Sequence, residues 1–318
     1  MMSQDISIPI SDLPMIGEVR DRPFVFVDLG SETDDVSGVR LPPVPVIGIG
    51  SRDHALAARL DTLIEPRFDA GAIARSIAAQ PLAARIVTQL LRLVPHLPDE
   101  DALAAESLAY AALQGSDAHR LWVSRRLRAE VVPREGGVQL SRDDDVLTIT
   151  LDRAEAGNAI DRTMRDALHE AFALANADST IAKVVLRAVG KAFSLGAELS
   201  EFGTTTDPAM AHAIRSMTLP AREAVHCRNR MEVLIDGACV GAGLELAAFA
   251  ARIVATRRSW FQLPELAMGI LPGAGGCVSL SRRIGRQRTL LMVLSGRRLS
   301  AREALDWGLV DALVDDPS

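Results

Sequence analysis

The stretch 231–276 combines Glu245 and Glu265 with runs of small residues, and these residue types together can do acid–base chemistry. Residues 231–235 are typical of a strand, and a helix is expected to begin after the small residues 240–243. That helix places Glu245 in its first turn, whereas Glu265 follows a second extended segment and a proline. The two carboxylates therefore arrive from different elements and can share one proton-transfer task.

The small residues around Glu245 add a second chemical feature. Because they carry little or no side chain, another molecule can approach the backbone closely. The start of a helix also offers unpaired N–H groups and a partial positive charge. We therefore predict an enzyme site for a substrate that develops negative charge on an oxygen. Taken singly, Glu245 is also explained as an acid favoured by the helix dipole, and Glu265 as a solvated loop acid.

The composition is that of an ordinary globular protein and excludes several functions. Hydrophobic residues make up 48% and charged residues 24% of 318 residues, a length that leaves room for about two domains. Asp and Glu number 41 against 35 Lys and Arg, and the formal net charge of −6 argues against nucleic-acid binding. Aromatic residues, at 4%, are too few for platforms on which bases stack.

No segment indicates secretion, a membrane or a metal site. Residues 1–14 carry neither a basic start nor an apolar run, so we expect no signal peptide. The most apolar window, 233–255, is interrupted by charges and is interpreted as a core helix rather than a membrane span. Cys227, Cys239 and Cys277 lack CxxC spacing, so we interpret them as buried or incidental thiols in a reducing compartment. The histidines show no metal-ligand spacing. We expect a soluble, cytoplasmic protein.

The elements that position the site follow a distinct N-terminal part, residues 1–132. Its glycines Gly48 and Gly50 lack the third glycine of a nucleotide fingerprint, which favours a plain strand-to-helix turn. Pro81 is expected to restart or kink a helix. We interpret 1–132 as a separate, small mixed α/β and helical unit of unknown role. Its expected strands are 24–29 and 44–50, and its expected helices are 54–63, 70–93, one from 99, and 116–130.

Beyond a linker at 133–137, strands and helices alternate through a second unit, 138–318. This alternation implies an α/β layer with right-handed crossovers. The expected elements are a hairpin at 138–140 and 146–151, a helix at 161–174, a strand at 182–186 and helices within 204–230, 279–285, 290–294 and 300–307.

Five ordered segments within 138–311 are similar to the motifs of a known family. They are LDR at 151–153 with GNAI at 157–160, KAFSLGAEL at 191–199, DGACVGAGLEL at 236–246, FQLPE at 261–265 with LPGAGG at 271–276, and SGRRLSAREALDWGLV at 295–310. In these segments the chain resembles the crotonase (enoyl-CoA hydratase/isomerase) superfamily. The resemblance implies an α/β fold with a crotonase-like ββα superhelix core, and it says nothing about residues 1–130.

The resemblance implies roles for five positions. The backbone amides of Ala197 and Ala242 are implied to stabilise negative charge on the thioester oxygen, with about 3–4 kcal/mol per donor in other oxyanion holes. Glu245 and Glu265 match the two glutamates with which hydratases of this family hold and activate water, one as base and the other as proton donor to the α-carbon. The Gly273 amide is implied to orient that water. Because both glutamates fall within matched motifs, catalysis is favoured over the structural explanations.

The resemblance also implies partners. Family members bind the CoA portion along two backbone stretches, which correspond to Asn158 and Ala159 and to Ser194 and Leu195. The implied partner is an acyl-CoA substrate from fatty acid metabolism. CoA enters as part of that thioester, so neither a separate cofactor nor a metal is expected. A homo-oligomer, either a trimer or a hexamer, is implied as well.

The implied function is hydration of a 2-enoyl-CoA to the 3-hydroxyacyl-CoA by an enoyl-CoA hydratase-like lyase. Isomerases of the family commonly keep one of the two acids, so the presence of both favours hydration. An isomerase, another crotonase-type lyase or oxygenase, and a non-catalytic acyl-CoA-binding or assembly subunit remain alternatives. A dinucleotide site at 241–243 is disfavoured because Leu246 occupies the third glycine position. A glycosidase carboxylate pair is disfavoured by the scarcity of aromatic residues.

Members of this family typically continue for several helices beyond the segment that matches 295–310, and those helices close the acyl pocket and support trimerisation. We therefore expect helices within 70–130 to cover the site, or to make the oligomer contact, in their place. Deletion of residues 1–130 is then expected to leave an insoluble or inactive core. Residues 202–219 match no pattern from which the acyl chain can be predicted.

Overall fold

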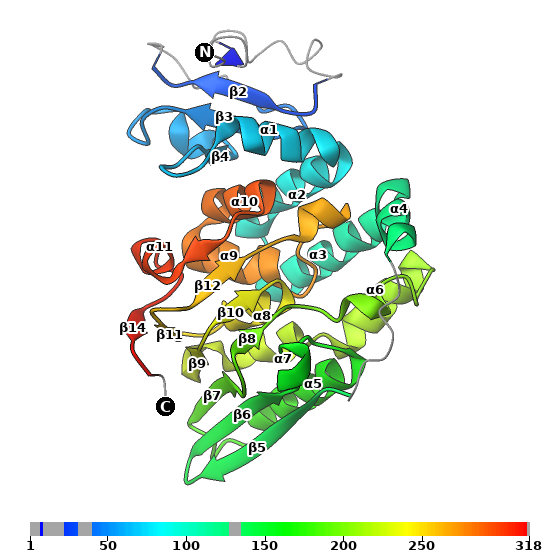
Figure 1. Cartoon of the computed structure of the whole chain (residues 1–318), viewed down its shortest axis with the longest axis vertical. Coiled ribbons are helices and arrows are strands. Elements are labelled where there is room, and N and C mark those ends of the chain that lie inside the picture. Colours follow the sequence, from blue (N-terminus) through cyan, green and yellow to red (C-terminus); the bar gives the residue numbers. More distant parts are fainter. Residues whose placement is uncertain (1–6, 9–21, 31–39, 127–134, 317–318) are drawn as a thin grey trace.

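The computed structural model describes residues 7–8, 22–30, 40–126 and 135–316. Within these residues the molecule is elongated, with a small sheet near the N-terminus at one end and a long hairpin at the other (Figure 1). Most of the helices lie between the two (Figure 1). Parts of the expected helix 116–130 and of the expected linker 133–137 lie outside the described residues.

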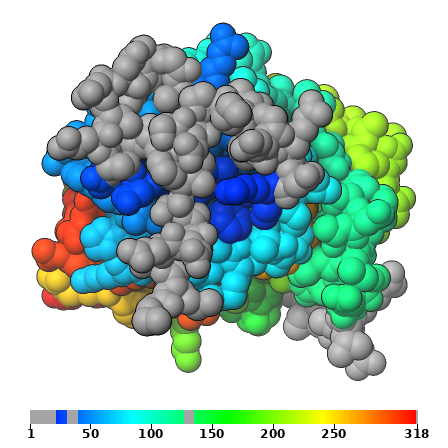
Figure 2. Space-filling model, turned by 90° about the horizontal axis from the view of Figure 1, so that it is seen from above, coloured from blue at the N-terminus to red at the C-terminus, as the bar shows by residue number. Residues whose placement is uncertain are grey.

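Four short parallel strands form the small sheet. They lie in the order β1 (Ser7–Ile8), β2 (Val25–Asp28), β3 (Val46–Ile49) and β4 (Thr62–Leu63). The two expected N-terminal strands are thereby confirmed. The first three residues of β2 and of β3 are buried in succession rather than alternately, which is typical of parallel strands covered on both faces. Figure 2 looks onto this end of the molecule, where strand residues in blue and helix residues in cyan face the viewer.

The helix expected over 54–63 does not form, and this prediction is wrong. The segment holds a single 3-10 turn and then enters β4. Leu56 and Leu60, which would share a helix face, are buried in an apolar cluster of the small sheet. The N–H of Asp61 donates to Val46 O at 3.0 Å, so the chain joins the sheet beside β3. Sheet pairing has overridden the helical periodicity of the leucines.

Four helices follow the small sheet: α1 (Ala70–Ala79), α2 (Pro81–Leu93), α3 (Asp99–Gln114) and α4 (Asp117–Arg125). Pro81 is the first residue of α2, so a helix restarts there as expected. The acidic residues that begin α3 lie at its positive end. Buried residues of α1, α2 and α3 belong to the same hydrophobic core as residues of 138–316. A boundary between two separate units near 132 stays a prediction.

Two sheets build the second half. The larger has the order β14 (Ala312–Val314), β11 (Arg252–Thr256), β9 (Met231–Ile235), β7 (Lys183–Ala188), β6 (Val146–Asp152) and β5 (Gly137–Asp143). Its pairings are parallel except for β5 with β6, which is the expected hairpin. The smaller has the order β13 (Leu299–Ser300), β12 (Trp260–Gln262), β10 (Ala238–Val240) and β8 (Ala192–Ser194). There β8, β10 and β12 are parallel, so their carboxyl ends meet at one edge.

The helices of the second half fall near the segments where the sequence predicts them. They are α5 (Arg162–Ala177), α6 (Pro208–Thr218), α7 (Pro220–Cys227), α8 (Ala242–Ala247), α9 (Gly276–Ile284), α10 (Arg286–Ser295) and α11 (Ala301–Asp306). Asp161 caps α5 by accepting the N–H of Met164 at 2.8 Å, which explains why that helix begins there.

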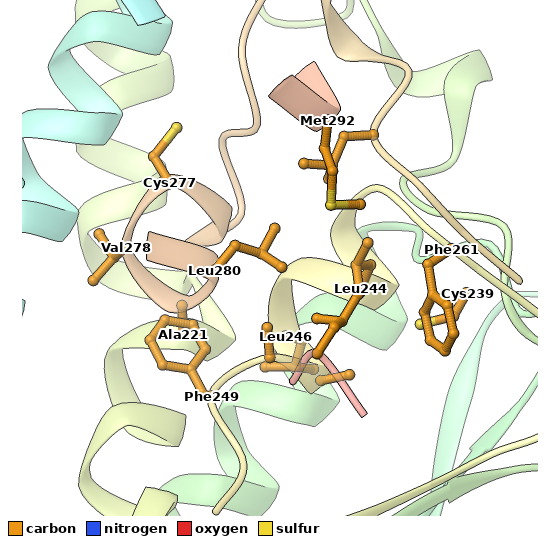
Figure 3. Close-up of a cluster of buried hydrophobic side chains, with 14 of the residues drawn as sticks. Ala221, Cys239, Leu244, Leu246, Phe249, Phe261, Cys277, Val278, Leu280 and Met292 are labelled. Carbon is orange, nitrogen blue, oxygen red and sulfur yellow. The ribbon is translucent and has the colours of Figure 1, made fainter. Parts of the chain in front are cut away.

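The core helix expected for the apolar window 233–255 is wrong in extent. The window holds most of β9, all of β10, the short helix α8 and most of β11. Leu244 and Leu246 of α8 lie in a cluster with Leu280 of α9 and Phe261 of β12 (Figure 3). The window is apolar because each of its elements is buried. Among the described residues, none of the helices has both the length and the apolar character needed to cross a bilayer.

Candidate active site

One cavity of about 330 Å³ lies where the carboxyl ends of β8, β10 and β12 meet the helices. Its lining includes all five positions to which the sequence assigned catalytic roles, namely Ala197, Ala242, Glu245, Glu265 and Gly273. The parallel pairing of β10 with both β8 and β12 brings the segments after these strands to the same edge. Tertiary structure thus brings together groups that are distant in the sequence.

The segments after β8 and β10 run closely past each other at two glycines. Gly196 has a φ of 97° and Gly241 a φ of 47°, in the region that favours glycine. A Cβ added to Gly196 would lie 3.2 Å from Val240 O, so the two backbones leave little room between them. Ala197 and Ala242 follow these glycines, and among the described residues neither of their N–H groups donates to a protein acceptor. Both residues line the cavity.

Glu245 is buried, and its carboxylate is held by the start of α9. Its Oε2 accepts the N–H of Ala274 at 2.6 Å and that of Gly276 at 2.9 Å. Burial raises the pKa of Glu245 to about 7, while the two N–H groups act in the opposite direction. A carboxyl with such a pKa can take up or release a proton near neutral pH, as a general base does.

Glu265 lies in a 3-10 turn, η7 (Glu265–Met268), and is buried rather than solvated. Among the described residues, no hydrogen-bond partner reaches its buried Oε2. A Cβ added to Gly241 would lie 2.7 Å from Oε1, so this carboxyl packs against the second glycine crossing. Burial raises the pKa of Glu265 well above its ordinary value, and the charge of Glu245 raises it further. Glu265 is therefore suited to carry a proton.

Gly273 lies at the cavity beneath an aromatic ring from the N-terminal part of the chain. A Cβ added to Gly273 would overlap the ring of Tyr110, which belongs to α3. The ring therefore requires glycine at this position. Within the described part of the chain, the Gly273 N–H donates to no protein group, so it can donate into the cavity.

The predicted CoA-binding positions are only partly brought to the cavity. Leu195 lines it, whereas Asn158, Ala159 and Ser194 do not. The Asn158 side chain instead accepts the N–H of Arg153 at 2.8 Å and donates to two backbone carbonyls. Ser194 Oγ donates to Asn158 O at 2.8 Å. These two side chains shape the loops beneath the cavity, and backbone contacts of all four residues with CoA stay a prediction.

Sequence reasoning missed a third carboxyl, Glu106 of α3. It is buried, and it accepts the N–H of Gly275 at 2.7 Å and that of Cys277 at 2.8 Å. Burial raises its pKa well above the ordinary value, and the charge of Glu245 adds to this effect. The signal was present in the sequence, because Glu106 stands at helical spacing between Leu103 and Leu113, on what the structure shows to be a buried helix face.

Helices α3, α4 and α6 complete the cavity wall with further residues that the sequence did not predict. Tyr110, Gln114 and His119 line the cavity from the first two helices. Arg215 of α6 lies 4.5 Å from the centre of the Tyr110 ring and donates to Gln114 Oε1 at 3.1 Å. His119 Nδ1 lies 2.9 Å from Met268 O, and burial lowers its pKa, so the ring is neutral near pH 7 and donates from Nδ1. Helices within 70–130 thus lie over the predicted site.

The three cysteines are free and buried, as the sequence predicts. Burial raises the pKa of Cys239 and Cys277 well above the ordinary value, which makes them unreactive. Within residues 7–8, 22–30, 40–126 and 135–316, no three His, Cys, Asp or Glu side chains converge as metal ligands would.

Comparison with known proteins shows which family the sequence resembles. The sequence model of the enoyl-CoA hydratase/isomerase family matches residues 141–317. The chain is 34% identical over 179 residues to the mevalonyl-coenzyme A hydratase SIDH of Beauveria bassiana, covering 54% of this chain and 64% of that protein. It is 33% identical over 171 residues to the 2,3-dehydroadipyl-CoA hydratase of Escherichia coli, covering 54% and 66%. In both comparisons the chain spans slightly less than two thirds of the relative's length.

A solved structure agrees with the sequence matches. The enoyl-CoA hydratase of Thermoplasma volcanium superimposes with a TM-score of 0.51 at 34% identity, covering 58% of this chain and 75% of that one. The crotonase-like α/β fold expected from the five motifs is confirmed.

Proposed function

Because the chain belongs to the enoyl-CoA hydratase/isomerase family, we propose that it hydrates a 2-enoyl-CoA thioester to the 3-hydroxyacyl-CoA. One observation carries this proposal. Glu245 and Glu265, buried on two different elements, line the same cavity as the N–H groups of Ala197 and Ala242. Addition of water needs two proton transfers and a place for negative charge on the thioester oxygen, and these four groups supply both.

In the proposed reaction the thioester carbonyl oxygen accepts the N–H groups of Ala197 and Ala242. Water attacks C3 as a carboxylate removes its proton, and the C2–C3 π electrons move to give an enolate at the carbonyl. A carboxylic acid then protonates C2 and restores the thioester, so the sum is one water added across the double bond. Each amide is expected to stabilise the enolate by about 3 kcal/mol, because it is positioned before the charge develops.

The environments of the two glutamates support a division of roles between them. Two N–H groups hold the Glu245 carboxylate, which favours its ionised form and makes it the base toward water. Glu265 has no partner on Oε2 among the described residues, and its pKa is raised by burial and by the charge of Glu245. It is therefore the acid that protonates C2. The N–H of Gly273, which donates to no group among the described residues, lies on the same cavity and helps orient the water.

The test follows the loss of enoyl absorbance with crotonyl-CoA and with longer 2-enoyl-CoA esters, for the wild type and for Glu265→Gln. Removal of a positioned general acid is expected to lower kcat by about a hundredfold or more. Turnover that Glu265→Gln leaves unchanged would remove Glu265 from the mechanism.

A 3-enoyl-CoA, assayed beside the 2-enoyl esters, distinguishes the alternatives. Conversion of a 3-enoyl-CoA to its conjugated isomer, without hydration, would make the protein an isomerase. Tight binding of CoA esters without turnover on any chain length, unchanged in Glu245→Gln, would make it a binding or assembly subunit. The homo-oligomer, the absence of a cofactor, the cytoplasmic location and a role in fatty acid metabolism stay predictions from the sequence.

A further inference from the structure

Four successive N–H groups at the start of α9 are shared alternately between two carboxylates. They belong to residues 274–277. The first and third, of Ala274 and Gly276, reach Glu245 Oε2 at 2.6 and 2.9 Å. The second and fourth reach Glu106 Oε1 at 2.7 Å and Glu106 Oε2 at 2.8 Å. Among the described residues, every carboxylate oxygen and every N–H of this set has a hydrogen-bond partner except Glu245 Oε1.

The two carboxylates come from opposite ends of the sequence. Glu106 belongs to α3 and Glu245 to α8, and both helices pack against α9. Both side chains are nearly inaccessible, with exposed fractions of 1% and 2%. The positive end of α9 attracts both, which offsets part of their mutual repulsion. The Oγ of Ser279 also donates to Glu245 O at 2.7 Å and ties α8 to α9.

Several charged or titratable groups face Glu106 from the surrounding elements. Glu245 on α8 and Glu265 in η7 are acidic, and Cys277 on α9 carries a buried thiol. Tyr110 lies one helical turn further along α3, and Arg215 faces Glu106 from α6. The Arg215 guanidinium donates to Ser107 Oγ at 3.0 Å and to Gln114 Oε1 at 3.1 Å.

We propose that Glu106 is a positioning residue for the proposed hydration. Its carboxylate accepts two N–H groups of the segment 274–277 and thereby fixes that segment. The N–H groups of Ala274 and Gly276 then hold the Glu245 carboxylate in one orientation. Glu106 does not line the cavity and therefore does not touch the substrate. It acts through Glu245, and α3 thereby becomes part of the active site.

This inference rests on the proposed function. Because Glu106 is proposed to act by accepting two N–H groups, the test variant removes one of its acceptor oxygens. Glu106→Gln keeps the size of the side chain but replaces one acceptor oxygen by an NH2 group that cannot accept an N–H. One of the two donors, Gly275 N–H or Cys277 N–H, then loses its partner. A buried donor without a partner costs free energy, so the segment is expected to shift or open locally.

The kinetic test is a double-mutant cycle with Glu245→Gln on crotonyl-CoA hydration. We expect Glu106→Gln to lower kcat at least tenfold with little change in KM. In the Glu245→Gln background we expect it to lower kcat less than twofold, because the group through which it acts is already gone. A similar loss of kcat in both backgrounds would overturn the proposal, since a general structural defect is additive. The matched control is Glu100→Gln, an exposed glutamate of the same helix, which should leave kcat unchanged.

A second measurement does not depend on turnover. Amide hydrogen exchange of residues 274–277 in the full chain should become at least tenfold faster in Glu106→Gln and stay unchanged in Glu100→Gln. Unchanged exchange in Glu106→Gln would refute the holding role even if the enzyme is a hydratase. Faster exchange in a protein that hydrates no ester would leave the holding role standing and reject the proposed function. If Glu106→Gln does not fold, Glu106→Asp, which keeps the charge but has a shorter reach, replaces it in both measurements.

Discussion

Gly276 donates its N–H to Glu245 Oε2 at 2.9 Å, and a Cβ added to Gly276 would lie only 2.5 Å from Glu245 Cγ. The same glycine thus orients the Glu245 carboxylate and leaves room for it. Its importance is not a matter of backbone conformation, because its φ is not in the left-handed region.

We expect Gly276→Ala to displace Glu245 and to lower kcat for crotonyl-CoA hydration at least tenfold. Overpacking of this buried site should also cost about 1–3 kcal/mol of unfolding free energy. Steady-state kinetics and urea unfolding measure the two effects. Gly137→Ala is the matched control, because a Cβ there would meet no described atom within 4 Å. Full activity in Gly276→Ala would show that Glu245 does not need the orientation seen in the structure.

A second glycine, Gly241, tests the turn that joins β10 to α8. Gly241→Ala combines a φ of 47° with a Cβ only 2.7 Å from Glu265 Oε1. The left-handed conformation costs an alanine about 1–2 kcal/mol, and the contact also moves Glu265 and the Ala242 amide. Activity should therefore fall at least a hundredfold. Gly308→Ala separates the two causes, because Gly308 has a φ of 75° and no atom of the described part of the chain lies within 4 Å of its added Cβ. That control should lose stability but keep its activity.

The pH dependence of stability reports the burial of Glu245. Its pKa is raised to about 7 in the folded protein, above the ordinary value of 4.5. The folded state therefore holds the proton more tightly, and the stabilisation present at pH 4 is lost as the pH rises toward 7. For one group this loss amounts to about 3 kcal/mol. Urea unfolding at pH 5 and at pH 8 should show a smaller difference in Glu245→Gln than in the wild type, and equal differences would contradict the raised pKa.

A buried ion pair supports the loop that carries Ala197. Arg153, with no exposed side-chain surface, donates to Glu198 Oε2 at 2.9 Å and to Ala159 O at 3.0 Å. Arg153→Ala leaves a partly buried Glu198 without its cation and should cost about 3–5 kcal/mol of unfolding free energy. Thermal unfolding measures this change. Arg302→Ala, which removes an exposed pair with Asp306, should cost less than about 1 kcal/mol.

The N-terminal helices give a prediction on a larger scale. Residues of α1, α2 and α3 share the hydrophobic core, and Tyr110, Gln114 and His119 line the cavity. Deletion of residues 1–130 would expose this core and open the cavity wall, so we expect an insoluble or inactive protein. Expression yield, circular dichroism and the hydratase assay test this expectation. A folded core with wild-type activity would show that the helices have no part in the site.

The sequence by itself determined that Glu245, Glu265 and the small residues beside them are candidate site residues, and it determined the positions of most helices. These features are local, because motif spacing and helical periodicity place Glu245 at a helix start and Pro81 at a helix restart without knowledge of distant contacts. Where local pattern and distant pairing disagreed, as at 54–63, pairing beside β3 decided the structure.

Only the tertiary structure decided that the N-terminal helices belong to the site. Glu106 accepts the N–H groups of Gly275 and Cys277, which lie far from it in the sequence. No local pattern within α3 predicts these hydrogen-bond partners. The sequence could show a charged residue on an expected apolar helix face. What that charge is for depends on the N–H groups that folding brings against it, since a buried carboxylate persists only where such donors meet it.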